Sequence, residues 1–95
     1  MNQKKLERIS SELGEVLKLK DYSFTCAESC TGGWVGHALT SISGSSEWFG
    51  SSFVTYSYEA KTQILGVSSE DLDSFGAVSE EIVEQMVLGL SLIHI

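Results

Sequence analysis

The sequence is poor in positive charge. Its 95 residues contain six lysines and arginines against 13 aspartates and glutamates, which gives a formal net charge of -7. A protein that neutralises nucleic-acid phosphates needs a basic patch, so this balance excludes a nucleic-acid-binding surface. We expect any bound phosphate to be held locally, by backbone N–H groups or by one or two cations.

Cysteine and histidine are also scarce, with two residues of each. Cys26 and Cys30 form no C-x-x-C pair and have no accompanying Cys/His pair, which argues against a structural zinc site. We expect both to be free thiols in a reducing cytoplasm. His37 lies about two helical turns, roughly 10 Å, beyond Cys30, so a Cys–His dyad is not expected.

Long apolar runs are missing too. No stretch is long enough to cross a bilayer, and no basic-then-apolar leader opens the chain. The composition, 42% hydrophobic and 20% charged, is that of an ordinary soluble domain. We therefore expect a cytoplasmic protein without a membrane partner, and at most one small domain with a modest core.

Hydrophobic periodicity predicts alternating helices and strands. The predicted helices cover 4–20, 34–42, 59–65 and 78–90, a helical turn covers 68–76, and the predicted strands cover 22–27 and 51–58. Strand–helix–strand crossovers produce parallel pairs, so this order predicts an α/β layered fold. Ser79 is the expected N-cap of the last helix. Two strands leave both sheet edges open, so we expect another chain or further sequence to complete the sheet.

Each predicted strand ends in a cluster of polar residues, "ESCTGG" at 28–33 and "YSYEAK" at 56–61. Ligands bind beyond the carboxyl ends of parallel strands, where helix N-termini offer N–H groups. Ser29 is either a nucleophile or a helix cap, and Cys30 is intrinsically the better nucleophile. A serine without histidine needs another base, for which Lys61 is the candidate. Tyr56 relays a proton, fixes the substrate or simply packs.

The other residues of the first cluster also leave two readings open. Glu28 is either a general base or a carboxylate stabilised at a helix start. Thr31 either binds phosphate or caps the helix. Gly32 and Gly33 either let the backbone approach a ligand closely or serve tight helix–strand packing. Spacing alone does not choose between these roles.

Three blocks of sequence, in order, resemble the CinA C-terminal domain family. They are "TCAESCTGGWVGHALTSISGSSEWFG", "SSFVTYSYEAKTQILGV" and "GAVSEEIVEQM". The stand-alone members of that family are nicotinamide-nucleotide amidohydrolases. The resemblance therefore implies a three-layer α/β/α domain that hydrolyses nicotinamide mononucleotide to nicotinate mononucleotide and ammonia, in pyridine nucleotide recycling. It implies no metal and no organic cofactor, and a homo-oligomer at full length.

The resemblance also implies roles for individual residues. The serine of "ESCTGG", Ser29, is the nucleophile; the lysine of the second block, Lys61, is the base; and Tyr56 is the helper. The rest of the first cluster is expected to bind the substrate or the oxyanion, with these members: Glu28, Cys30, Thr31, Gly32 and Gly33. Tyr58 departs from the asparagine usual in the family and is expected to alter substrate contacts.

Residues 1–89 cover only the N-terminal part of such a domain, whose later strands and glycine-rich loop are expected to complete the sheet and pocket. Residues 90–95, "LSLIHI", fit neither the helix nor the charge pattern of the family. We expect them to be a non-native tail and give His94 no role. Two other functions stay open: a non-catalytic nucleotide-binding or regulatory module, and a thiol enzyme built on Cys30.

The first prediction concerns the 95-residue chain by itself. Open sheet edges and a small buried surface should leave little net stability, so we expect aggregation or non-cooperative unfolding. We also expect no ammonia release from nicotinamide mononucleotide above background. A sharp, reversible thermal transition of a monomer, together with measurable turnover, would contradict this expectation.

Overall fold

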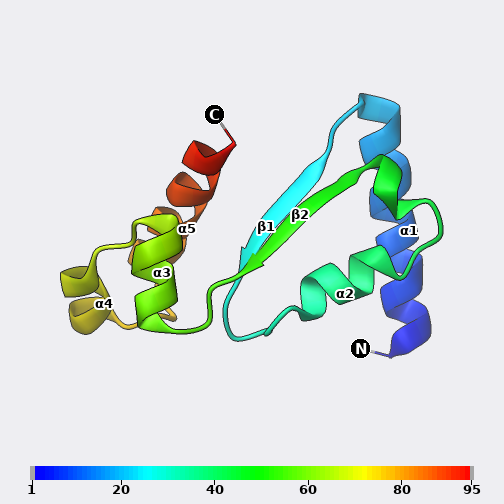
Figure 1. Ribbon diagram of the computed structural model, residues 1–95. Coiled ribbons are helices and arrows are strands. Elements are labelled where there is room, and N and C mark those ends of the chain that lie inside the picture. Colours follow the sequence, from blue (N-terminus) through cyan, green and yellow to red (C-terminus); the bar gives the residue numbers. More distant parts are fainter. Residues whose placement is uncertain (1, 95) are drawn as a thin grey trace. The chain divides into compact units, whose positions relative to one another are not determined.

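A computed structural model describes residues 2–94 of the chain (Figure 1). In chain order, its elements are α1 (Gln3–Lys20), β1 (Phe24–Glu28), α2 (Trp34–Thr40), the short 3-10 helix η1 (Ser45–Glu47), β2 (Phe49–Val54), α3 (Tyr58–Leu65), α4 (Ser69–Phe75) and α5 (Glu80–Ile93). This alternation of helices and strands confirms the predicted α/β class.

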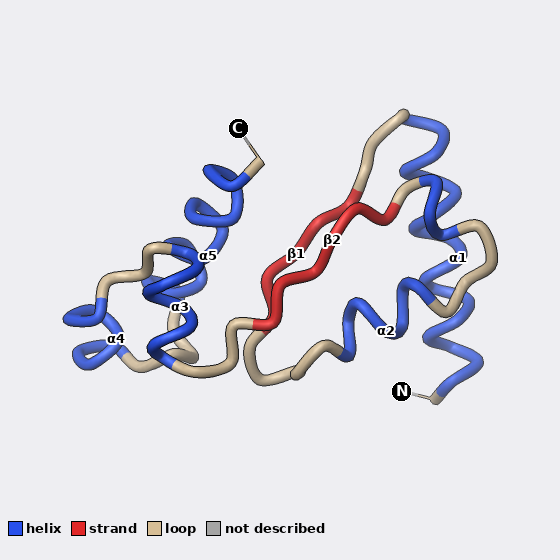
Figure 2. Tube along the Cα trace, viewed as in Figure 1, coloured by secondary structure: helices blue, strands red, loops and turns tan. Residues whose placement is uncertain are grey.

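The two strands are neighbours in one parallel sheet (Figure 2). At the start of β1, the Phe24 N–H donates to the Trp48 carbonyl at 2.7 Å. Just past the end of β2, the Thr55 N–H donates to the Glu28 carbonyl at 2.9 Å. The strands end side by side, so the segments that follow them start close together.

The chain forms two compact units. The first comprises Met1–Cys26 and Gly33–Ser52, and the second comprises Ala27–Gly32 and Phe53–Ile95. Both strands begin in the first unit and end in the second. The second unit therefore holds the carboxyl ends of both strands, together with α3, α4 and α5.

In the first unit, α1 packs against α2 and the loop that follows it. Asn2 caps α1 by accepting from the Lys5 N–H at 2.8 Å. The buried positions of α1 are Ser10 and Gly14. Of the apolar residues that recur along the helix, Leu6, Leu13 and Leu17 are half-buried, whereas Ile9 and Val16 are exposed. Trp48, 3% exposed, covers Gly14, where a Cβ would lie 2.6 Å from the indole nitrogen.

In the second unit, α3, α4 and α5 pack around one apolar cluster (Figure 1). Its buried members are Leu65, Val67, Leu72, Ile82, Met86 and Leu90. Phe53 and Ala27 pack against this cluster from the ends of the two strands. Burial of this surface supplies the main hydrophobic stabilisation of the unit.

Each of these three helices begins with a serine cap. Ser57, Ser68 and Ser79 accept from the N–H groups of Ala60, Asp71 and Ile82, at 3.0, 3.2 and 3.3 Å. The predicted cap at Ser79 is thus confirmed. Each serine satisfies an N–H group that would otherwise lack a partner in the first turn.

Capping also explains where the strand predictions were wrong. The second strand was predicted over 51–58 but ends at Val54, because Ser57 takes the Ala60 N–H and starts α3. The first was predicted from residue 22 but begins at Phe24, because the Tyr22 N–H closes the end of α1 on the Leu17 carbonyl at 2.9 Å.

The helix boundaries needed smaller corrections. The last helix was predicted over 78–90 but runs over Glu80–Ile93, since Ser79 is its cap and the helix continues past Leu90 to the cap at His94. The helix predicted over 34–42 ends at Thr40, whose hydroxyl bonds back to the Gly36 carbonyl at 2.7 Å.

Gly89 lies where α5 approaches the backbone of α3 closely, and a substitution there tests this packing. A Cβ built at this position would lie 1.9 Å from the Leu65 carbonyl oxygen, so the helices must separate to accept a side chain. We expect Gly89→Ala to cost about 3 kcal/mol, at the upper end of usual overpacking. Protection of α3 and α5 amides against hydrogen exchange should fall roughly a hundredfold.

The control for Gly89→Ala is Ser91→Ala, at an exposed position of the same helix. This change should leave amide protection within a few-fold of the parent. Equal protection in the Gly89→Ala and Ser91→Ala variants would show that the close approach of α5 to α3 does not constrain the unit.

Candidate active site

The candidate site lies in the second unit and is formed by three short segments. They are the turn 29–32 after β1, the segment 55–57 after β2, and Lys61 in the first turns of α3. The Thr55 N–H to Glu28 carbonyl bond joins the first two segments at their roots. α3 then returns Lys61 toward both of them.

The turn after β1 is held in two ways. The Gly32 N–H donates to the Ser29 carbonyl at 2.9 Å, which closes a tight turn around Cys30 and Thr31. Gly32 has φ of 62°, a left-handed conformation that glycine adopts without steric cost. Across the same turn, the Thr31 hydroxyl donates to Glu28 Oε1 at 2.8 Å.

Lys61 is fully buried and makes three hydrogen bonds through its amine. Its Nζ lies 2.7 Å from Ser29 Oγ, 2.7 Å from the Thr55 carbonyl oxygen and 2.9 Å from the Tyr56 carbonyl oxygen. This position follows from local folding. The strand ends before Thr55 and Ser57 starts α3, so Lys61 lies one turn into the helix and reaches back to the carbonyls that precede it.

Burial lowers the pKa of Lys61, while the charge interaction with the nearby Cys30 raises it to a lesser degree. A protonated lysine has three donors and no acceptor, which matches three oxygens. A neutral amine has two N–H groups and one lone pair. The two carbonyls can accept only, so in the neutral form they take both N–H groups and leave the lone pair for the Ser29 hydroxyl.

The structure brings Ser29, Cys30 and Lys61 together, as the strand-end argument predicts. Ser29 is partly buried, whereas Cys30 is exposed. Both cysteines are free, as expected. Tyr56 is 67% exposed, and its contact with Lys61 is made by the backbone carbonyl.

The structure also decides between alternatives that spacing left open. α2 begins at Trp34 with Gly33, φ 103°, as its N-cap and without a side-chain cap, so neither Ser29 nor Thr31 caps it. The Thr31 hydroxyl is bonded to Glu28 instead. Glu28 is the last residue of β1 and is 4% exposed, so it does not lie at a helix start.

Sequence reasoning missed the part played by Thr55. Its carbonyl accepts from Lys61, its N–H donates to Glu28, and its buried hydroxyl has no partner within residues 2–94. Backbone acceptors have no signature in a sequence. The one usable signal was Ser57, a good N-cap residue, which marks the end of the strand before Tyr56.

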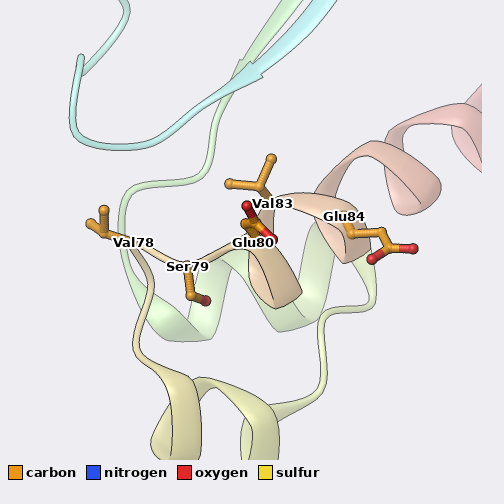
Figure 3. Close-up of a pocket in the computed structure, with 5 residues that line it drawn as sticks. All are labelled: Val78, Ser79, Glu80, Val83 and Glu84. Atoms are coloured by element: carbon orange, nitrogen blue, oxygen red, sulfur yellow. The ribbon is translucent and has the colours of Figure 1, made fainter.

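A separate pocket lies at the start of α5 (Figure 3). It is lined by Val78, Ser79, Glu80, Val83 and Glu84. Its only hydroxyl, that of Ser79, donates to the Gly76 carbonyl at 2.8 Å and accepts from Ile82. Because its serine is engaged in capping, this pocket offers less chemistry than the Ser29–Lys61 pair.

Membrane-spanning helices and metal-binding side-chain clusters are both absent from residues 2–94. Within residues 2–94, no helix is long and apolar enough to cross a membrane. The same part of the chain contains no cluster of three or more histidine, cysteine, aspartate or glutamate side chains that could hold a metal ion.

The chain belongs to the CinA family: the profile of the CinA C-terminal domain matches residues 6–93. It is 52% identical over 90 residues to the nicotinamide-nucleotide amidohydrolase PncC of Enterobacter agglomerans, across 95% of this chain and 55% of the relative. The Escherichia coli K12 protein of the same name is 49% identical, across 94% and 54%. The chain thus spans about half the length of the curated relatives it matches.

Solved structures agree with this assignment. A competence damage-inducible protein A from Klebsiella pneumoniae superposes with a TM-score of 0.88 at 34% identity, over 94% of this chain and 56% of that one. A competence/damage-inducible protein from Agrobacterium tumefaciens has a TM-score of 0.84 at 40% identity, over 88% and 51%. The predicted family resemblance is confirmed.

Burial of Lys61 predicts a pH dependence of stability. An ordinary lysine titrates near pH 10.4, and the pKa of Lys61 lies below its ordinary value in the folded chain. Between the folded pKa and about 10.4, the unfolded chain binds more protons, so the free energy of unfolding rises with pH. Below the folded pKa, the full cost of burying the ammonium applies.

This prediction is tested by urea midpoints of the helical circular dichroism signal, measured from pH 7 to pH 10 in residues 1–89 joined to the second half of the Escherichia coli relative and in the Lys61→Met variant of that fusion. The difference between the two removes the contribution of the tyrosines and cysteines. The parent should gain stability relative to the variant as pH rises. Parallel pH profiles would show that Lys61 carries no burial penalty.

Proposed function

We propose that this chain carries the nucleophile and the base of a nicotinamide-nucleotide amidohydrolase, with Ser29 and Lys61 in those roles. The observation that carries the proposal is the 2.7 Å contact between Lys61 Nζ and Ser29 Oγ, made by a fully buried amine. The names of relatives about 50% identical to the chain support the reaction class.

In the proposed mechanism, Ser29 Oγ attacks the carboxamide carbon of nicotinamide mononucleotide while Lys61 Nζ takes the hydroxyl proton. The tetrahedral intermediate collapses, the C–N bond breaks, and Lys61 returns the proton to the departing ammonia. Water activated by Lys61 then hydrolyses the acyl-serine ester, releasing nicotinate mononucleotide and freeing Ser29. The reaction balances with water as the only co-reactant.

The turn after β1 and Tyr56 would supply the other groups that the proposed reaction needs. The Gly32 N–H is engaged with the Ser29 carbonyl. The other backbone N–H groups of residues 30–33 lie near Ser29 in sequence and would stabilise either the oxyanion or the substrate phosphate. Tyr56 is exposed and available to help with proton transfer or to contact the substrate. We propose a small-molecule nucleotide substrate, a cytoplasmic enzyme and a homo-oligomer at full length.

The test uses an amidase made by joining residues 1–89 of this chain to the second half of the Escherichia coli relative. Ser29→Ala should lower kcat by several orders of magnitude, because the covalent nucleophile is lost. Lys61→Arg keeps the charge but cannot act as a neutral base, so it should be nearly inactive. Cys30→Ala is the matched control and should keep most of the activity. Ammonia release from nicotinamide mononucleotide is the readout.

Two results would overturn the proposal in different ways. Loss of activity in Cys30→Ala with an active Ser29→Ala would indicate a thiol enzyme. No turnover in the parent fusion, together with binding of the nucleotide, would favour a non-catalytic nucleotide-binding or regulatory module.

A further inference from the structure

Glu28 is a buried acidic residue for which the proposed reaction has no use. It ends β1 and is 4% exposed. A carboxylate is costly to bury unless its oxygens find donors. One donor is the hydroxyl of Thr31, 2.8 Å from Oε1. We therefore ask what a buried carboxyl group next to Ser29 in sequence does for the site.

Glu28 is tied to both halves of the site. Its backbone carbonyl accepts from the Thr55 N–H at 2.9 Å, and the Thr55 carbonyl in turn accepts from Lys61 Nζ at 2.7 Å. Its side-chain oxygen Oε1 accepts from the hydroxyl of Thr31, two residues after Ser29 in the sequence. One residue therefore fixes the distance from the base segment to the nucleophile turn.

These bonds form a closed circuit around Ser29. The circuit runs from Ser29 Oγ to Lys61, to Thr55, to Glu28 and through Thr31 back to the turn, which the Gly32 N–H closes on the Ser29 carbonyl at 2.9 Å. Thr31 is exposed, and within residues 2–94 its hydroxyl is bonded to Glu28. Without that bond, the turn loses its side-chain restraint.

We propose that Glu28, acting through Thr31, is the positioning residue that holds Ser29 Oγ within reach of Lys61. This inference rests on the proposed function of Ser29 and Lys61. Misplacing a reacting group by about 1 Å costs on the order of a hundredfold in rate. Loss of the Glu28–Thr31 bond should therefore act on the chemical step while leaving substrate affinity in place.

The geometry distinguishes this role from direct participation. The general base position at Ser29 Oγ is already occupied by Lys61 Nζ, at 2.7 Å. A residue that is 4% exposed also offers little surface to a nucleotide. Glu28 needs only to accept a hydrogen bond, and an amide oxygen does this as well as a carboxylate oxygen.

The experiment measures Ser29 reactivity in the fused amidase with a fluorophosphonate, followed by intact mass. In this reaction the Oγ–P bond forms, the P–F bond breaks and fluoride leaves, while Lys61 takes the serine proton. The variants are Glu28→Ala, Glu28→Gln, Thr31→Val, Thr31→Ser and the double variant Glu28→Ala/Thr31→Val. The same changes in the fused amidase give kcat and KM for nicotinamide mononucleotide.

Glu28→Ala and Thr31→Val should each lower the labelling rate and kcat ten- to a hundredfold, with KM within threefold of the parent. The double variant should be no slower than the slower single variant, because both changes remove one bond. Glu28→Gln and Thr31→Ser keep an acceptor and a hydroxyl, respectively, and should recover most of the rate. Thr31→Val changes an exposed position, so a folding defect would not explain its effect.

Three outcomes would overturn the inference. A Glu28→Gln variant as slow as Glu28→Ala would assign Glu28 to proton transfer, and a raised KM at unchanged kcat would assign it to substrate binding. Parent-like rates in Thr31→Val would show that the bond is irrelevant. The Ser29→Ala variant separates failure of the positioning role from failure of the proposed function. If this variant is still labelled and active, the proposed function fails, whatever Glu28 does.

Discussion

Lys61 carries an amine that has no access to solvent, and each of its donors must find an oxygen inside the protein. Two of the oxygens are backbone carbonyls at the end of β2, and the third is the Ser29 hydroxyl. Satisfying this amine requires the strand ends, the turn after β1 and the first turns of α3 to meet at one point. The rest of the second unit supports this arrangement. Its apolar cluster packs against α3 and so fixes the position from which the Lys61 side chain extends.

The same requirement explains how the site balances two opposing effects. Burial favours the neutral amine, which a general base needs, while the three oxygens and the charge interaction with Cys30 favour the ammonium. Burial is the larger effect, so the pKa falls. In the proposed mechanism, a lysine held in this way would accept a proton from Ser29 and return it to the leaving group while staying in place.

The convergence of Ser29 and Lys61 could be predicted from the sequence, because it depends on a general rule about the carboxyl ends of parallel strands. The start of α5 at Ser79 could be predicted for a similar reason, since capping is local. The Thr55 and Tyr56 carbonyls could not, because every residue has a carbonyl. The Glu28–Thr31 bond and the burial of Trp48 over Gly14 were also beyond the sequence, because both depend on side chains meeting in the folded chain.

The central claim is that a buried, proton-accepting Lys61 activates Ser29. Its most direct test is the titration of Lys61 itself in the fused amidase, followed through the 13Cε chemical shift of the side chain by NMR over the range from pH 6 to pH 11. We predict a midpoint below that of the exposed lysines in the same chain, and a change in this midpoint when Ser29 is replaced by alanine. A Lys61 midpoint equal to that of the exposed lysines and unaffected by Ser29→Ala would contradict the account.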